Sequence, residues 1–438
     1  MDATTSMPGQ RRFIFLQGPH GPFFEGLGQR IRAAGYEVWR VGFNRADQAF
    51  WRSHGYIAFR ETLDVWPETL AEIIRTRGIT DLVCYGASRP VHRVALEVCR
   101  THRVTSHVFE EGYLRPYWIT YERGGANASS SVVPLSLTQM EAALSAGRPA
   151  TTEVPDHWGD MRAHIFWGAA YHAVLMGGNR DYPGFRPHRT PDVGREFMLH
   201  LRKLLSTPWR DMSRRIASSR IRHGGFPYHL VMMQLAHDAN FRDHGPFKSQ
   251  SAFLETVFRG FAQGAPRHHH LVLKAHPLED GREPIRPLVR HLSQAFGLED
   301  RVHYIAGGKL ARLLDSARSA ITVNSTSAEQ ALWRGLPLKA FGDAVYNRPE
   351  FVSRQPLAAF FNDPTLPNRE AYLTYRAFLL ATCQIPGGFY ATRNRRKLLR
   401  QMPDLMLETQ SPVARLLAED RAASAAGRQH LSIVSQST

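Results

Sequence analysis

Cysteine and long apolar runs are both scarce in this chain. Only three of its 438 residues are cysteine, and none forms a CxxC pair. This argues against a disulfide framework and a structural zinc site. No apolar run reaches the roughly 18 residues that a membrane-spanning helix needs, and Met1–Gln10 lacks an apolar signal core. We therefore expect a cytosolic protein with reduced cysteines.

Acidic residues are also few relative to basic ones. Lysine and arginine total 55 while aspartate and glutamate total 39, a net charge of +16. Such a charge favours polyanions, which include nucleic acid, anionic lipid and nucleotide sugars. The arginines are spread along the chain, without zinc-finger spacing or an RNA-recognition signature. We therefore favour a membrane-surface enzyme with an anionic substrate and no nucleic-acid partner; the alternative is an ordinary solvated basic surface.

Two common nucleotide-binding motifs are missing. The chain has neither a GxGxxG fingerprint nor a Walker loop, so dinucleotide and ATP binding have no direct support. His268-His269-His270 resembles a metal tract, but it lies at the entry of an expected strand, and we predict no metal site. The turn Gln17-Gly18-Pro19 resembles a loop that lets an acceptor or donor approach the backbone.

Apolar runs alternate with helical patterns in both halves of the chain. Hydrophobic residues make up 43% and charged residues 21%, which is typical of a globular protein. The alternation implies parallel sheets with helices on both faces and ligands beyond the carboxyl ends of the strands. We predict an α/β, GT-B-like fold, in which two Rossmann-like β-α-β domains surround a central cleft. The expected strands are Arg12–Leu16, Glu37–Val41, Asp81–Tyr85, Thr105–Phe109, Tyr228–Leu235, Leu271–Lys274, Val302–Tyr304, Ala320–Val323 and Leu338–Phe341.

The composition changes along the chain and suggests domain boundaries. After about residue 135, tryptophan, arginine and helix formers dominate, and a Pro-rich stretch follows at Tyr182–Pro187. We expect an N-terminal Rossmann-like acceptor-side domain (10–135), a helical connecting region (136–222), a C-terminal nucleotide-sugar-binding domain (223–392), a C-terminal helix (393–421) and a flexible tail (422–438).

The first candidate site is Glu110-Glu111-Gly112, which follows the apolar run Ser106–Phe109. Adjacent carboxylates repel each other, and this repulsion can raise one pKa into the range of a general base. The glycine permits a sharp turn of the backbone. The alternative for such a motif alone is a solvated acidic turn.

The second candidate is His276-Pro277, which closes the run Leu273-Lys274-Ala275. A histidine just beyond a buried strand can donate a hydrogen bond to a phosphate, and Lys274 can add positive charge. A structural histidine is the alternative.

The third candidate is Asn324-Ser325-Thr326-Ser327, which precedes an expected helix at Ser327–Arg334. Its hydroxyl groups can cap the helix, and the free N–H groups of that helix can bind a phosphate. Gln234 and Asp238, near the end of another strand, could line the same cleft or belong to a polar loop. A carboxylate, a histidine and a hydroxyl cluster together are typical of a glycosyltransferase that uses a nucleotide-activated sugar.

The order of these motifs resembles the bacterial capsule-polysaccharide β-Kdo glycosyltransferase family, whose members serve capsule biosynthesis and export. The similar blocks cover roughly residues 12–392 and are more specific together than any one alone. They are Leu16–Pro19 with Pro22–Phe24, Gly42–Asn44 with Asp47 and Phe50-Trp51, Glu110–Pro116 with Trp118–Thr120, Gln234-Leu235 with Asp238 and Pro246-Phe247, Lys274–Pro277, Asn324–Ser327 with Ala331-Leu332 and Gly335–Pro337, and Gly387–Tyr390.

This resemblance implies CMP-β-Kdo as the donor substrate. We expect an inverting, metal-independent displacement without a cofactor. By position, Glu110 or Glu111 corresponds to the general base, His276 to the CMP phosphate contact, and Ser325 and Thr326 to the phosphate or sugar-carboxylate contacts. Gln17, Gly18 and Arg115 belong to the acceptor or cleft side. The chain departs from the pattern at Ala275, where a second histidine is common, and at Ser327, where glycine is common.

The resemblance also implies a place in the cell and a set of partners. A single module resembles the member that adds the first Kdo to (lyso)phosphatidylglycerol and so starts the poly-Kdo linker of a capsule. We expect a cytoplasmic protein on the inner membrane, near other capsule synthesis or export proteins, with arginine-rich Trp209–Arg222 as a candidate membrane contact or an ordinary solvated helix. Another GT-B transferase using sialic acid or a hexose, and a non-catalytic assembly protein, remain the alternatives.

Overall fold

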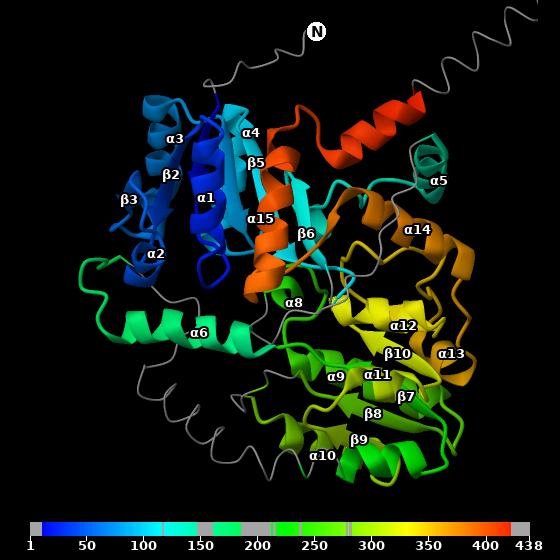
Figure 1. The fold of residues 1–438 in the computed structure, drawn as a ribbon. Coiled ribbons are helices and arrows are strands. Elements are labelled where there is room, and N and C mark those ends of the chain that lie inside the picture. Colours follow the sequence, from blue (N-terminus) through cyan, green and yellow to red (C-terminus); the bar gives the residue numbers. More distant parts are fainter. Residues whose placement is uncertain are drawn as a thin grey trace, which may run out of the picture. The chain divides into compact units, whose positions relative to one another are not determined.

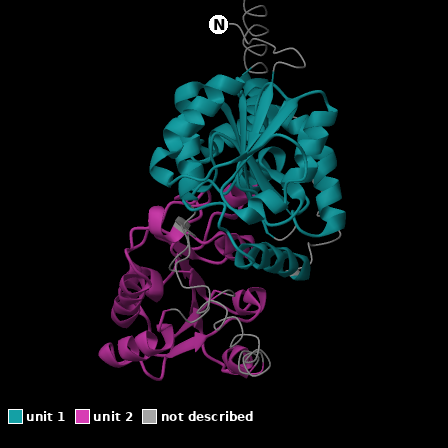
Figure 2. Ribbon diagram, turned by 90° about the vertical axis from the view of Figure 1, so that its left-hand side faces the viewer, with its two compact units in different colours: residues 1–187, 374–438 teal, residues 188–373 magenta. Residues whose placement is uncertain are grey.

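The alternating apolar runs form two separate sheets, one in each unit of the fold. The computed structural model describes residues 11–115, 118–146, 161–184, 212, 216–235, 239–276, 279 and 283–421. Residues 1–187 and 374–438 make up unit 1, and residues 188–373 make up unit 2 (Figure 2). Unit 2 is therefore inserted, in sequence, between two segments of unit 1.

Unit 1 is built on a mixed sheet (Figure 1). Its strands are β1 (Arg12–Phe15), β2 (Glu37–Gly42), β3 (Tyr56–Ala58), β4 (Asp81–Tyr85), β5 (Thr105–Glu111), β6 (Trp118–Arg123) and β12 (Gln384–Pro386). Among the described residues their order is β12-β6-β5-β4-β1-β2-β3. The strands β1 to β5 pair in parallel, whereas β6 is antiparallel to β5 and β12 is antiparallel to β6.

Helices cover both faces of this sheet. The helices of unit 1 include α1 (Phe23–Ala33), α2 (Arg45–Ala49), α3 (Trp66–Arg77), α4 (Pro90–His102), α5 (Leu137–Ala146), α6 (Met161–Met176) and α15 (Thr392–Leu407). The chain passes from unit 2 into unit 1 within α14 (Arg369–Thr382).

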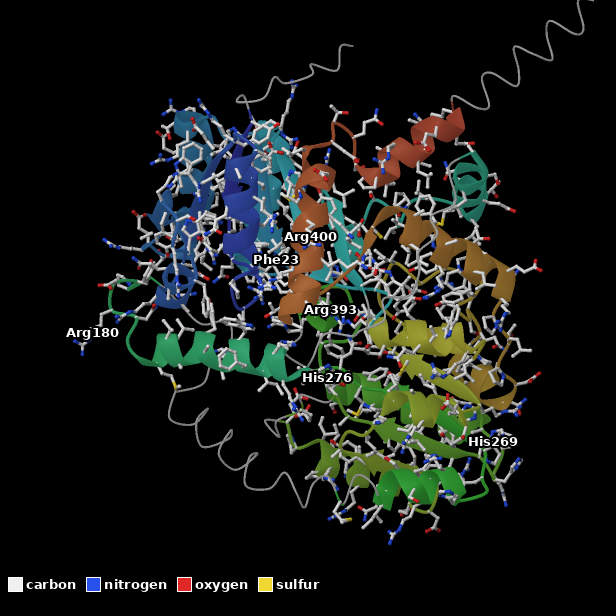
Figure 3. All side chains as sticks on the ribbon, in the orientation of Figure 1. Phe23, Arg180, His269, His276, Arg393 and Arg400 are labelled. Carbon is white, nitrogen blue, oxygen red and sulfur yellow. The ribbon has the colours of Figure 1, made fainter. Side chains whose placement is uncertain are left out.

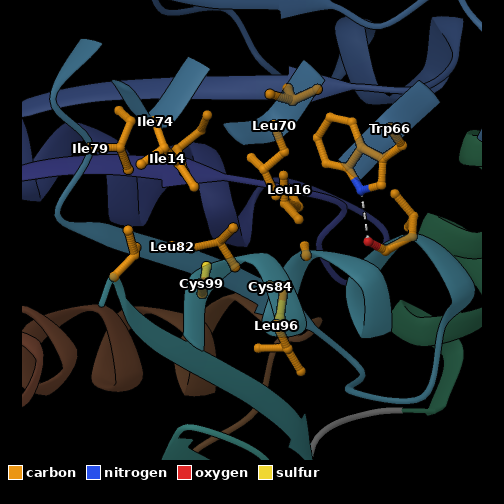
Figure 4. Packing of buried hydrophobic residues seen from close by; sticks show 14 of the residues in the cluster. Ile14, Leu16, Trp66, Leu70, Ile74, Ile79, Leu82, Cys84, Leu96 and Cys99 are labelled. Atoms are coloured by element: carbon orange, nitrogen blue, oxygen red, sulfur yellow. Dashed lines mark hydrogen bonds between the residues drawn. The ribbon is translucent and has the colours of Figure 1, made fainter. Parts of the chain in front are cut away.

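Two hydrophobic cores follow from the period of two along β1. Ile14 and Leu16 pack on one face with residues of α3 and α4, while Phe13 and Phe15 pack on the other face with residues of α1 and α15. Figure 4 shows the first core, where the indole Nε1 of Trp66 donates to the carbonyl of Val91 over 3.0 Å. Each large apolar side chain buried in this way contributes about 1.5–3 kcal/mol.

Unit 2 has a sheet whose strands all run parallel. They are β7 (Tyr228–Met232), β8 (His270–Lys274), β9 (Val302–Ile305), β10 (Ser319–Thr322) and β11 (Leu338–Ala340), in the order β11-β10-β7-β8-β9 among the described residues. Its helices include α8 (Ala239–Asp243), α9 (Gln250–Gly264), α10 (Ile285–Ala295), α11 (Leu310–Leu314), α12 (Glu329–Trp333) and α13 (Leu357–Asn362). Residues of α9, α10 and α13 form its core with β7, β8 and β10.

The prediction of two Rossmann-like α/β domains, the pair that makes up a GT-B chain, is confirmed for each unit taken by itself. The expected bounds of β4 agree with the structure. The acidic strand differs, because β5 does not end at Phe109: antiparallel pairing with β6 extends it to Glu111. The helix expected at Ser327–Arg334 is shorter, with a 3₁₀ turn at Thr326–Ala328 before α12.

The sequence-based domain boundaries need correction. Unit 1 continues to residue 187 and also contains residues 374–438, whereas we expected the C-terminal domain to extend to residue 392. The reason is that β12 pairs with β6, and α15 packs in the core of Phe13 and Phe15. The tail at 422–438 lies outside the described residues, as do most of the connecting region after residue 184 and, within Trp209–Arg222, residues 209–211 and 213–215.

Candidate functional site

Polar side chains gather at the carboxyl ends of the parallel strands in each unit. In unit 1 the carboxylate cluster comprises Tyr85, Glu110, Glu111, Asn127 and Tyr390. In unit 2 the histidine–hydroxyl cluster comprises Gln234, Lys274, His276 and Asn324–Ser327. The predicted base and the predicted phosphate contacts therefore belong to different units, and each cluster is described within its own unit.

Glu110 is a half-buried carboxylate with fixed partners. One oxygen, Oε1, accepts from the backbone N–H of Ala87 at 3.1 Å and from the amide of Asn127 at 3.2 Å. Burial raises the pKa of Glu110 to about 7, although the Ala87 N–H and the nearby guanidinium groups of Arg89 and Arg115 act to lower it. A carboxyl group with this pKa can accept a proton near neutral pH.

The cause of this shift differs from the expected one. Burial makes the largest contribution to the pKa of Glu110, and repulsion from Glu111 makes the smallest of those that act on it. Neighbouring residues of a strand point to opposite faces of the sheet, so the two carboxylates have separate surroundings. In the pairing of β5 with β6, Glu110 lies opposite Thr120 and Glu111 lies opposite Ile119.

Glu111 is held by two tyrosines. Its Oε1 accepts from the hydroxyl of Tyr85 at 3.0 Å, and Tyr390 also forms a side-chain hydrogen bond with Glu111. The ring of Tyr390 stacks on His164 of α6, with centroids 4.1 Å apart and planes inclined by 2°. Burial lowers the pKa of His164, so the neutral imidazole is favoured there. Helix α6 thus reaches the carboxylate cluster.

Asn127 connects Glu110 to a deeper buried network. Its backbone has φ of 57°, a left-handed conformation that asparagine adopts more readily than most residues. Its N–H donates to the hydroxyl of Tyr113 at 2.6 Å, and that hydroxyl donates to Glu122 at 2.8 Å. Tyr113 and Glu122 therefore hold the turn that presents the Asn127 amide to Glu110. No sequence motif marks Asn127.

Gly112 has a steric role rather than the expected turning role. A Cβ atom at this position would lie 2.1 Å from the carbonyl oxygen of Trp118 on the next strand. Its φ is not among the positive values of the chain, so close approach is the reason that glycine stands here. Arg115 donates through Nε to the Gly112 carbonyl at 3.2 Å, and its positive charge lies near Glu110.

Gln17 and Gly18 have structural partners in unit 1. Gln17 is buried, and its amide donates to Asp47 Oδ2 at 3.0 Å. Its carbonyl accepts from the N–H of Tyr85 at 3.1 Å, which places the Gln17 backbone beside the carboxylate cluster. At Gly18 a Cβ atom would come within 2.7 Å of the Phe24 ring.

In unit 2 the strands β10, β7 and β8 are neighbours, so the residues that follow them meet at one edge. Gln234 and Asn324 form a reciprocal pair: the Gln234 amide donates to Asn324 Oδ1 at 2.8 Å, and the Asn324 N–H donates to Gln234 Oε1 at 3.0 Å. Both residues are buried. This pair fixes the start of the hydroxyl segment relative to β7.

The hydroxyl segment Ser325–Ser327 is a tight turn with half-buried side chains. The hydroxyl oxygens of Ser325 and Ser327 lie 2.7 Å apart, and Ser325 Oγ accepts from the Ser327 N–H at 3.3 Å. Tyr346 donates to the Ser325 carbonyl at 2.8 Å. These contacts hold the hydroxyl groups at the edge of the sheet.

The basic residues of this cluster lie at the end of β8. Lys274 is its last residue and is buried, and its Nζ donates to the Ala275 carbonyl at 3.3 Å. His276, labelled in Figure 3, is half-buried, and its carbonyl accepts from the Glu279 N–H at 3.0 Å. Pro277 and Asp238 lie outside the described residues.

The histidine run at 268–270 lies at the opposite, amino end of the unit 2 strands. His270 Nδ1 and His303 Nε2 are 2.8 Å apart, and His229 Nε2 and His269 Nδ1 are 3.1 Å apart. Within the described ranges, no group of three or more His, Cys, Asp and Glu side chains is arranged to hold a metal ion. No helix in the same ranges has the length and hydropathy to cross a bilayer.

Comparison with known proteins shows similarity along most of the chain. Residues 80–390 match the family described as capsule polysaccharide biosynthesis protein. The chain is 31% identical to the capsule polysaccharide modification protein LipB of Neisseria meningitidis serogroup B, over 86% of this chain and 91% of LipB. It is 27% identical to the capsule polysaccharide export protein KpsS of Escherichia coli, over 89% of this chain and 99% of KpsS.

Among solved structures, the chain is similar to the β-Kdo 2,7 transferase of KpsC from Thermosulfurimonas dismutans. The two are 12% identical, and the comparison covers 90% of this chain and 100% of the other, with a TM-score of 0.41.

Proposed function

The chain belongs to the capsule polysaccharide biosynthesis protein family, and from this membership and its two polar clusters we propose that it is an inverting glycosyltransferase. Its donor is CMP-β-Kdo and its acceptor is (lyso)phosphatidylglycerol, so the reaction starts a poly-Kdo linker. The observation that carries the proposal is the half-buried carboxylate of Glu110, with a pKa of about 7, at the carboxyl end of a sheet strand.

Glu110 is the general base in this proposal. The acceptor hydroxyl oxygen attacks the anomeric carbon of Kdo as its proton passes to the Glu110 carboxylate. The bond between the anomeric carbon and the phosphate oxygen breaks, and CMP leaves with the electron pair. Arg89, Arg115 and the Asn127 amide favour the charged form of Glu110 before the reaction. Glu111, bound to Tyr85 and Tyr390, orients this end of the strand.

The histidine–hydroxyl cluster binds the donor phosphate. Lys274 supplies positive charge, and His276 with Ser325 and Thr326 supplies hydrogen-bond donors to the phosphate oxygens. A monophosphate leaving group carries less charge than a diphosphate, so the proposal requires no metal ion. The Gln234–Asn324 pair holds the hydroxyl segment in place for this contact.

The test is transfer from CMP-Kdo, generated in situ, to a fluorescent lysophosphatidylglycerol, read by mass spectrometry. We expect a product one Kdo heavier for the natural chain, and loss of that product for Glu110→Gln and His276→Ala. Glu97→Gln makes the same chemical change at an exposed carboxylate of α4 and serves as the matched control. CMP binding, followed by calorimetry, should be retained in Glu110→Gln and weakened in His276→Ala.

Other results would point to other functions. CMP binding without a product would retain the nucleotide site and require other acceptors or sugars, such as sialic acid. The absence of both product and CMP binding would favour a non-catalytic assembly or export role, which the name of the E. coli capsule polysaccharide export protein KpsS suggests. Full activity in Glu110→Gln would contradict the assignment of the base.

A further inference from the structure

Helix α6 has one face that is anchored to unit 1. Tyr171 accepts from the Asn44 amide at 2.7 Å and donates to Asp47 at 3.2 Å. Trp167 lies against Gly21, where an added Cβ would come within 2.9 Å of the indole. With the stacking of His164 on Tyr390, these contacts orient the helix across the carboxyl ends of the parallel strands (Figure 1).

The opposite face of α6 is exposed and mostly apolar, with Arg162 and His172 the exposed polar residues of the helix. Ile165 is 64% exposed, Phe166 is 61% exposed and Met176 is 55% exposed. Ala169 and Ala173, which are also exposed, continue the same stripe at helical spacing. Ordinary soluble surfaces expose large apolar side chains singly, whereas a continuous stripe along a helix marks an interaction surface.

Exposed arginines lie at the C-terminal end of this stripe. Arg45 donates through its N–H to Asn179 Oδ1 at 2.8 Å and through Nη1 to the Gly178 carbonyl at 3.4 Å, so it lies beside the residues that follow α6. Arg180 is exposed at the same end (Figure 3). Asp181 follows it and is the first acidic residue after the helix, because α6 itself contains none.

Exposed basic residues also lie near the other end of the helix, on α15. The Arg395 guanidinium lies 5.9 Å from the ring centre of Trp167 of α6. Arg393 and Arg396, on either side of it in sequence, are exposed. An apolar stripe with arginines near both of its ends is complementary to the surface of an anionic bilayer, where acyl chains lie beneath charged headgroups.

We propose that α6 docks unit 1 on an anionic phospholipid bilayer, with Ile165, Phe166 and Met176 inserted at the boundary between headgroups and acyl chains. The inference deepens the proposed function, since it names the surface from which a lipid acceptor is taken. The inner face of α6 supplies the link: His164 stacks on Tyr390, and Tyr390 is bonded to Glu111. The helix that docks on the bilayer is therefore itself in contact with the carboxylate cluster of the same unit.

The test is co-sedimentation of the full chain with vesicles of phosphatidylglycerol and phosphatidylcholine, compared with vesicles of phosphatidylcholine alone. The triple variant Ile165→Ser, Phe166→Ser, Met176→Ser should bind the anionic vesicles at least about tenfold more weakly. The matched control replaces Trp333 and Leu366, which are 50% and 74% exposed in unit 2, with serine and should bind normally. Arg180→Glu with Arg393→Glu should weaken binding and reduce its dependence on salt.

Unchanged vesicle binding of the triple variant would overturn the proposal, and so would a stable dimer of the natural chain that the triple variant abolishes. Transfer to a water-soluble, short-chain lysophosphatidylglycerol separates this inference from the proposed function. Normal transfer by the triple variant, with lost vesicle binding, supports docking by α6. If the natural chain transfers no Kdo but its vesicle binding still depends on α6, docking by α6 is supported and only the proposed function fails.

Discussion

At the scale of single residues, the environment of each carboxylate matters more than the acidic motif. Glu110 and Glu111 are adjacent in sequence, yet one is bound by a backbone N–H and an amide and the other by tyrosine hydroxyls. The sequence was enough to predict that one glutamate has a raised pKa. It could not identify Asn127, because the contact joins a strand to a turn that only the fold brings close.

The raised pKa of Glu110 predicts a pH-dependent effect on stability. An ordinary glutamate has a pKa of 4.5, and Glu110 in the folded chain has a pKa of about 7, so the folded state binds more protons between these values and loses stability as pH rises through them. Glu110→Gln should therefore raise the free energy of unfolding at pH 8 by on the order of 1–2 kcal/mol, and change it little at pH 4.

Urea unfolding of the natural chain and the variant at both pH values measures this difference. Glu97→Gln, exposed on α4, should show no such dependence. A variant that is less stable than the natural chain at pH 8 would show that Glu110 is stabilised as a charged group, contrary to the prediction.

At the scale of elements, the two ends of the unit 2 strands have different properties. The carboxyl ends carry amide and hydroxyl groups, whereas the amino ends of β7, β8 and β9 lie next to paired histidines. Phe226 stacks on His270, with ring centres 3.8 Å apart. The run at 268–270 could be assigned to a strand entry from sequence, but the contact with His303 depends on strand order.

These histidines predict loss of stability in acid. Burial, with a smaller contribution from His270, lowers the pKa of His303 to about 4 from 6.5, so the unfolded chain binds more protons below pH 6.5 and stability falls as pH decreases towards 4. His303→Phe keeps the stacking and removes this titration. It should reduce the loss of unfolding free energy between pH 7 and pH 4.5 by about 1–2 kcal/mol.

Chemical unfolding at the two pH values tests this prediction. His291→Phe, at an exposed position of α10, is the matched control and should leave the pH dependence unchanged. If His303→Phe has the same acid sensitivity as the natural chain, His303 is already protonated in the fold.

At the scale of the whole molecule, the chain leaves unit 1 and returns to it. The alternation of strands and helices predicts each sheet from local sequence. The return of the chain to unit 1 cannot be predicted in this way, because β12 has only three residues and its partner β6 lies far away in sequence. Helix α15 could be predicted as a helix but not assigned to unit 1. Its partners Phe13 and Phe15 are in the first strand.

This return predicts the effect of shortening the chain. Ending it at residue 392 removes Leu398, Leu399, Met402 and Met406 from the core of unit 1. Four such side chains at about 1.5–3 kcal/mol each match the whole stability of a typical domain, so the shortened chain should not fold unit 1. Circular dichroism and thermal unfolding measure the loss. A cooperative transition like that of the full chain would restore the sequence-based boundary at 392.

The position of β12 also governs when the protein can become active during its synthesis. The Gln384 side chain accepts from the Leu114 N–H at 3.1 Å and donates to Thr120 at 2.9 Å, so it fixes the loop beside the two carboxylates. Tyr390, which holds Glu111, is made six residues later. A ribosome therefore completes unit 2 before it supplies the last parts of the carboxylate cluster. Under the proposed function, a nascent or truncated chain would complete its donor-binding cluster in unit 2 before its general base has been assembled.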